Sequence, residues 1–97
     1  TRAAERDVVG IYDHIADRSP ERAVKWFAEI ERQAQTLSQY PKRCPVIPEA
    51  DDIGLDYRHL IWSHYRTVFR IQGSTVYVVR VIHGAQLPDT ETLERSD

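Results

Sequence analysis

The stretch DYRHLIWSHYRTVFRIQGSTVYVVRVIH, residues 56–83, decides the fold. It contains three runs rich in β-branched and aromatic residues, a composition typical of β-strands, at 56–62, 65–72 and 75–83. The connectors, Ser63-His64 and Gly73-Ser74, are long enough for hairpins but too short for a helical crossover. The stretch therefore predicts three antiparallel strands joined as a meander.

The middle run alternates between two sets of side chains, which indicates a sheet with two different faces. One face carries Tyr65, Thr67, Phe69 and Ile71, and the other carries Arg66, Val68, Arg70 and Gln72. We expect the first face to pack against helices, with Phe69 and Ile71 buried. The second face is expected to present its arginines to a partner.

Two amphipathic helices precede the sheet region. Apolar residues three and four apart predict the first helix over residues 2–18. Ser19 and Pro20 supply an N-cap and a first helical residue, and so predict a second helix over 20–39. So short a connection folds the two helices back on each other as an antiparallel hairpin, residues 2–39. The apolar stripe of the second helix is Ala23, Phe27, Ile30, Ala34 and Leu37. We expect Phe27, Ile30 and Leu37 to be buried, and Trp26 to pack within the hairpin beside the stripe.

The remaining segments have no periodic pattern. Residues 40–55 contain three prolines and predict a surface loop that leads to the sheet, and residues 88–97 form an acidic tail. Together the segments predict the fold class α+β. A single domain, residues 1–97, packs an N-terminal helical hairpin on a small antiparallel β-sheet.

Composition narrows the classes of function. With 97 residues, 41% hydrophobic and 29% charged, the chain is typical of one globular domain. Cys44 is the single cysteine, which excludes an internal disulfide and is typical of the cytoplasm, where we expect the protein to be located. No apolar run approaches the roughly 20 residues needed to span a bilayer, so no membrane partner is expected. The spacing of Cys44, His59, His64 and His83 matches no metal motif, and we expect neither a metal nor a cofactor.

The charge is unevenly distributed although the net charge is only −2. Between residues 53 and 87 the charged side chains are Asp56 and four arginines, namely Arg58, Arg66, Arg70 and Arg80. A locally basic sheet suits an anionic partner, which can be RNA, DNA or an acidic peptide. These four arginines are therefore candidate partner-binding or target-binding residues. The alternative is that they pair with carboxylates of the protein's own helices.

Some of these residues also suit the chemistry of RNA cleavage. Attack by a 2′-hydroxyl needs a general base, a general acid and cations on the phosphorane, which Glu49, His83 and the arginines can supply. Strand alternation puts Arg80 on the opposite side of the sheet from His83. Either a β-bulge changes that phase, or Arg80 is a buried ion-pair residue.

The order of the motifs resembles that of the RelE/ParE superfamily of bacterial toxins. A helical hairpin and a proline-rich loop are followed by G-x-x-x-R-x-L, Y-R-x-x-F-R-I and V-x-H-G, which begin at Gly54, Tyr65 and Val81. The resemblance covers residues 2–86. One departure is that the superfamily normally begins with a strand that leads into the first helix. Thr1 starts at the helix, so that strand either lies outside the given sequence or is missing, and if it is missing we expect an open edge of the sheet.

The resemblance implies the toxin of a type II toxin–antitoxin module, neutralised by a cognate antitoxin in a toxin–antitoxin hetero-oligomer. In one branch, ParE-like members inhibit DNA gyrase and have no nuclease site. In the other, RelE-like members cut mRNA on the ribosome, and Glu49, Arg66 and His83 fall where some of them place the base, the phosphate-binding arginine and the general acid. The long helices and the lack of strong basic charge favour the ParE-like branch. Two non-toxin alternatives are a peptide-binding module and a metal-dependent nuclease.

Overall fold

The computed structural model describes residues 1–48 and 56–84. Two helices, α1 (Arg2–Ala16) and α2 (Pro20–Gln35), precede the 3₁₀ turns η1 (Thr36–Ser38) and η2 (Pro41–Arg43). Three strands then form an antiparallel sheet in the order β1 (Tyr57–Trp62), β2 (Tyr65–Gln72), β3 (Thr75–His83). The predicted α+β class, helical hairpin and β-meander are confirmed. Loop residues 49–55 and the acidic tail 88–97 lie outside the described residues.

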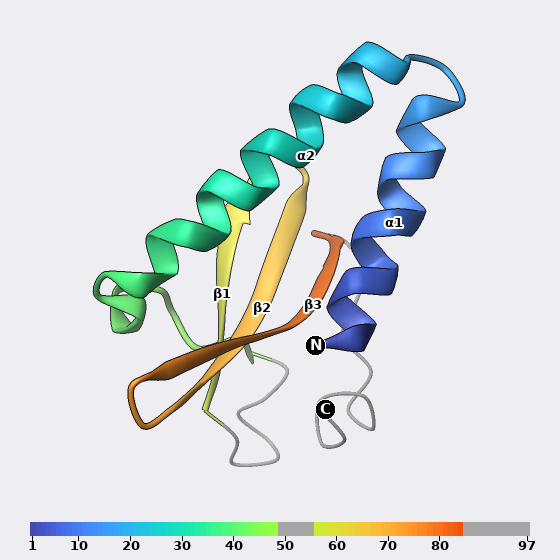
Figure 1. The fold of residues 1–97 in the computed structure, drawn as a ribbon. Coiled ribbons are helices and arrows are strands. Elements are labelled where there is room, and N and C mark those ends of the chain that lie inside the picture. The colour runs from blue at the N-terminus through green and yellow to red at the C-terminus, as the bar shows by residue number, and fades with distance from the viewer. Residues whose placement is uncertain (49–55, 85–97) are drawn as a thin grey trace.

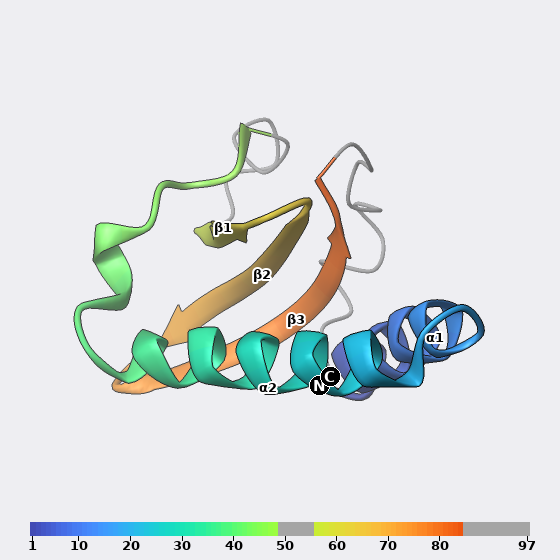
Figure 2. The same ribbon diagram turned by 90° about the horizontal axis from the view of Figure 1, so that it is seen from above.

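The helices lie on one side of the sheet (Figures 1 and 2). α2 crosses one face of the sheet, and α1 runs beside β3 at the sheet edge. The turn between the helices follows from local sequence, because the Ser19 hydroxyl accepts a hydrogen bond from the Arg22 N–H at 3.2 Å and Pro20 is the first helical residue. α2 is shorter than the predicted range 20–39 because its last residues tighten into η1.

The helix-facing side of the sheet forms most of the core. Trp26 and Ile30 of α2 pack with Val81 of β3, and Leu37 packs with Phe69 of β2, which is fully buried. The predicted burial of Ile30, Leu37 and Phe69 and the packing of Trp26 are therefore confirmed.

The phase of α2 corrects one expectation about the core. Phe27 is 41% exposed, whereas Trp26 is 6% exposed and its ring packs edge-on against Tyr65. Positions 26 and 27 both continue the stripe through Ala23 and Ile30, but they point about 100° apart around the helix. The larger indole of Trp26 faces the sheet, and Phe27 lies to the side of α2, where it contacts Tyr12.

Ile71 of β2 was also expected to be buried, but it is only half-buried.

The far face of the sheet, which carries Arg66, Val68 and Arg70, is not an open charged surface. Its centre is a second apolar cluster composed of Ile47, Tyr57, Val68, Val79 and Ile82. Residues 45–47 lie against the outer edge of β1, where the Ile47 N–H donates to the Tyr57 carbonyl. Arg66 is 6% exposed. The expectation that this whole face presents its arginines to a partner is therefore wrong for its centre.

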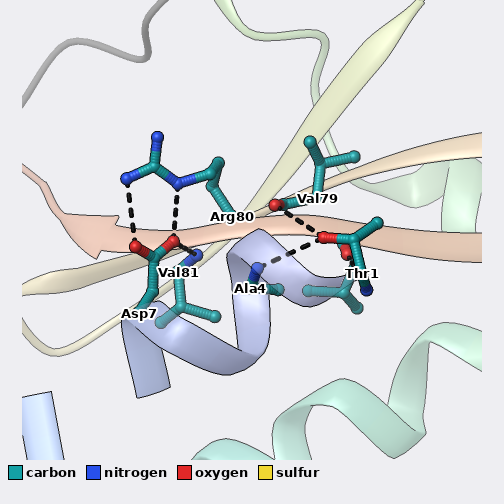
Figure 3. A network of polar contacts seen from close by, with 7 residues as sticks. Thr1, Ala4, Asp7, Val79, Arg80 and Val81 are labelled. Atoms are coloured by element: carbon teal, nitrogen blue, oxygen red, sulfur yellow. Dashed lines mark hydrogen bonds and ion pairs between the residues drawn. The ribbon is translucent and has the colours of Figure 1, made fainter. Parts of the chain in front are cut away.

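A polar network joins α1 to β3 (Figure 3). The Asp7 carboxylate accepts two hydrogen bonds from the Arg80 guanidinium, at 2.6 and 3.0 Å, and one from the Val81 N–H at 2.9 Å. Thr1 donates from its backbone nitrogen to the Val78 carbonyl and from its hydroxyl to the Val79 carbonyl, each at 3.0 Å. These contacts occupy the edge of β3 between Val78 and Val81. We call Asp7, Arg80 and Val81 the edge latch.

A β-bulge in β3 sets up this network. Val68 pairs with Arg80 and Phe69 pairs with Val78, so Val79 is an extra residue in β3. The bulge and the ion pair, two alternatives left open by the sequence, thus occur together. The bulge precedes Arg80, so it does not bring Arg80 and His83 onto one face.

We predict that Asp7→Ala destabilises the protein by about 2–3 kcal/mol, because a mostly buried charge pair and a strand-edge hydrogen bond are lost together. Asp7→Asn, which keeps an acceptor for Val81, is expected to lose less. Urea unfolding followed by circular dichroism measures both changes. Asp13→Ala, a change of an exposed acid on the same helix, is the control. Equal stability of the Asp7→Ala and Asp13→Ala variants would contradict a structural role for the latch.

Candidate functional site

An apolar groove lies between α1, α2 and β3, and we call it the hairpin groove. The helices are closest at their connecting turn and diverge from it (Figure 1), which leaves part of the helix-facing side of the sheet uncovered. The groove has a volume of about 510 Å³. Its apolar lining includes Ala4 and Val8 of α1, Phe27 and Ile30 of α2, and Val78 and Val81 of β3.

The rim of the hairpin groove exposes large apolar side chains. Val9 is 59% exposed and Phe27 is 41% exposed, and both line the groove. Exposed apolar side chains gathered around a concave apolar surface are typical of a site that binds another protein segment. The residues missed by the sequence reasoning are therefore Val9 and the outward-turned Phe27. Val9, which lies off the apolar stripe of its helix, was the available signal.

The structure does not bring Arg66 and His83 together. Arg66 pairs across the strands with Ile82, and His83 pairs with Tyr65, so the two side chains leave the sheet on opposite faces. Arg66 is buried, with its Nη1 3.4 Å from His59 Nδ1. His83 is exposed at the end of β3, where its ring stacks on His64 and meets Tyr65 edge-on. Glu49, the predicted base, lies outside the described residues.

The other candidate arginines make contacts within the chain. Arg58 donates to the Cys44 carbonyl at 2.7 Å and pairs with Asp56 at 3.3 Å, which fixes the preceding loop on β1. The Arg70 guanidinium lies 4.4 Å from the centre of the Tyr77 ring. Arg80 belongs to the edge latch. Each of the four arginines thus has a structural contact, and their partner-binding role remains a prediction.

Two further properties bear on the kind of site. Within residues 1–48 and 56–84, no three His, Cys, Asp or Glu side chains lie close enough to hold a metal ion. None of the helices described is both long and apolar enough to cross a bilayer.

The helical hairpin on a three-stranded antiparallel sheet is the α+β arrangement of the RelE/ParE superfamily. Within it, a family model described as the ParE toxin of type II toxin–antitoxin systems, parDE, matches residues 1–88. The chain therefore belongs to the ParE toxin family. No match was found among curated proteins. Membership supports a toxin function and implies an antitoxin partner.

Arg66→Ala is expected to lower stability by about 3 kcal/mol, because it leaves a cavity on the far face and removes the contact of the buried guanidinium with His59. Arg70→Ala, on the same strand and face, is expected to lose about 1 kcal/mol, the contribution of its contact with Tyr77. Thermal and urea unfolding of both variants measure the difference. An Arg66→Ala variant as stable as the parent protein would show that the buried guanidinium is dispensable for folding and is retained for another reason.

Proposed function

We propose that this chain is a ParE-like toxin that inhibits DNA gyrase, and that its antitoxin neutralises it by binding in the hairpin groove. The observation that carries the choice of target is the separation of Arg66 from His83. Cleavage of RNA needs acid, base and phosphate-binding groups around one scissile bond, within hydrogen-bond reach of it. A buried arginine on one face and an exposed histidine on the other do not supply that arrangement.

The hairpin groove supports the second half of the proposal. Its floor is apolar, its rim exposes Phe27 and Val9, and it extends between residues 1–9 and residues 27–34. An amphipathic antitoxin segment that folds on binding can bury its apolar side against such a floor. The antitoxin then competes with any contact that the helices make with gyrase.

A second candidate function is retained because His83 is accessible. Its imidazole is exposed and stacked on His64, so it is available for proton transfer to a bound RNA. This is the RelE-like alternative, a ribosome-dependent mRNA endonuclease.

The substitution His83→Gln separates the two toxin chemistries. A gyrase inhibitor requires no proton transfer from His83, so we expect the variant to stop growth and to inhibit supercoiling of relaxed plasmid by purified gyrase as the parent does. A nuclease that loses a general acid is slowed by roughly 10²- to 10⁴-fold. Transcript integrity in expressing cells is measured in parallel.

The matched control is His64→Gln, which removes the other ring of the stack. Circular dichroism verifies the fold of both variants. The gyrase proposal fails if the parent cleaves transcripts rapidly and only His83→Gln abolishes that cleavage.

Phe27→Ala tests the antitoxin site. Because Phe27 is an exposed aromatic at the rim, we expect the variant to stay folded but to bind the co-expressed antitoxin roughly 30-fold more weakly, as when an aromatic anchor is truncated. Val24→Ala, 58% exposed on the same helix and absent from the groove lining, is the control. Calorimetry with purified antitoxin measures both affinities, and equal affinities would place the antitoxin elsewhere.

A further inference from the structure

A second groove lies between the carboxyl end of α2 and the tip of the β2–β3 hairpin, and we call it the hairpin-tip groove. Its volume is about 1180 Å³. Leu37, Ile71 and Val76 contribute apolar lining, and Tyr40 and Lys42 also line it. Ile71 and Val76 are only half-buried, so apolar surface of the sheet is open to an occupant here.

Tyr40 is held in an unusual conformation at this groove. Its φ is 51°, in the left-handed region that residues other than glycine rarely adopt. Tyr40 is also 85% exposed. The turn is fixed by Pro41 and by the Arg43 guanidinium, which donates to the carbonyls of Gln39 and Tyr40 at 2.6 and 3.2 Å. An exposed aromatic on a fixed backbone loses little conformational entropy when a partner covers it.

The two grooves are continuous. Ala34 of α2 and Val78 of β3 line both of them, so a single track runs from Phe27 along α2 and η1 to Tyr40. The track follows α2 for about 12 Å between Phe27 and Gln35, the rise of eight helical residues, and then passes η1. One peptide segment of moderate length can therefore occupy both grooves at once.

The charges at the two ends of the track have opposite signs. Among the described lining residues, the hairpin groove contains Glu5 and Glu31 and no lysine or arginine. The hairpin-tip groove contains Lys42 and Arg43 and no acid among the residues described there. Charge pairs at the rim of an apolar site select the orientation of a partner, because a reversed segment places like charges together.

We propose that one partner segment fills both grooves, with an acidic end seated at Tyr40 and Lys42 and its apolar side chains along Ala34 and Val78. The proposal rests on the proposed function, in which the antitoxin supplies this segment, and it adds the orientation and charge of the segment. The hairpin-tip end is thus the part of the site that distinguishes a correct partner from one of reversed polarity.

The test is a selection of displayed random peptides of about 16 residues, long enough to span the track, against the purified chain. Enriched peptides are expected to combine an apolar run with acidic residues gathered at one end.

Lys42→Glu should weaken the binding of these peptides roughly tenfold, since an attraction becomes a repulsion. Tyr40→Gly should weaken it as well, and because glycine accepts a positive φ, the fold is kept. A selection repeated on the Lys42→Glu variant should enrich peptides with basic ends.

Lys25→Glu is the control, because Lys25 is an exposed residue of α2 that lines neither groove. The proposal is overturned if no peptide is enriched, if binding is indifferent to both Lys42→Glu and Tyr40→Gly, or if ultracentrifugation shows a dimer of the chain that occludes the track. The peptide measurements use neither gyrase nor growth. A chain that binds such peptides but leaves gyrase active would refute the proposed target and support the docking track. A chain that inhibits gyrase but binds no such peptide would refute the docking track and support the proposed target.

Discussion

The three hydrogen bonds accepted by Asp7 determine where α1 lies, and the candidate site depends on that placement. Arg80 and the Val81 N–H hold the first turns of α1 at the edge of β3, while the Ser19-Pro20 turn holds its other end close to α2. A helix fixed at these two points diverges from α2 instead of packing along its full length. The hairpin groove is the space that this divergence leaves above the sheet.

The β-bulge at Val79 makes the latch possible. In a regular strand Arg80 would share the helix-facing side with Val78, where a guanidinium would be buried among apolar residues. The extra residue moves Arg80 to the side of Val68, from which its guanidinium meets Asp7 at the sheet edge. It also leaves two consecutive carbonyls, of Val78 and Val79, that Thr1 satisfies. One irregularity in β3 thus accounts for the ion pair and for the covered edge.

Local sequence patterns predicted the helices and strands of this fold better than they predicted the contacts between them. The period-two alternation of residues 65–72 gave the bounds of β2, and the Ser19-Pro20 signal gave the start of α2. The choice between Trp26 and Phe27 as the buried residue was not encoded locally, because both continue the same helical stripe and only the position of Tyr65 decides it. The edge latch was not encoded locally either, because Asp7 and Arg80 are 73 residues apart in sequence.

The basic residues of the strands gave a misleading prediction of the partner-binding surface for a related reason. Arg58 and Arg66 are used within the fold, whereas Lys42, which lines the hairpin-tip groove, lies in the loop that had no periodic signal.

The open grooves also bear on the stability of the chain without its partner. In the part of the chain that the structure describes, three strands and two helices bury a small core, and the apolar side chains of Val9 and Phe27 stay in water. A partner that binds only the folded chain adds about 2.7 kcal/mol of stability when its free concentration is roughly one hundred times its Kd. That contribution is comparable to the loss expected on removal of the edge latch. Binding in the hairpin groove and the latch therefore act on the same equilibrium, because both require α1 to lie against β3. A partner in the hairpin groove stabilises the placement of α1 that forms this groove.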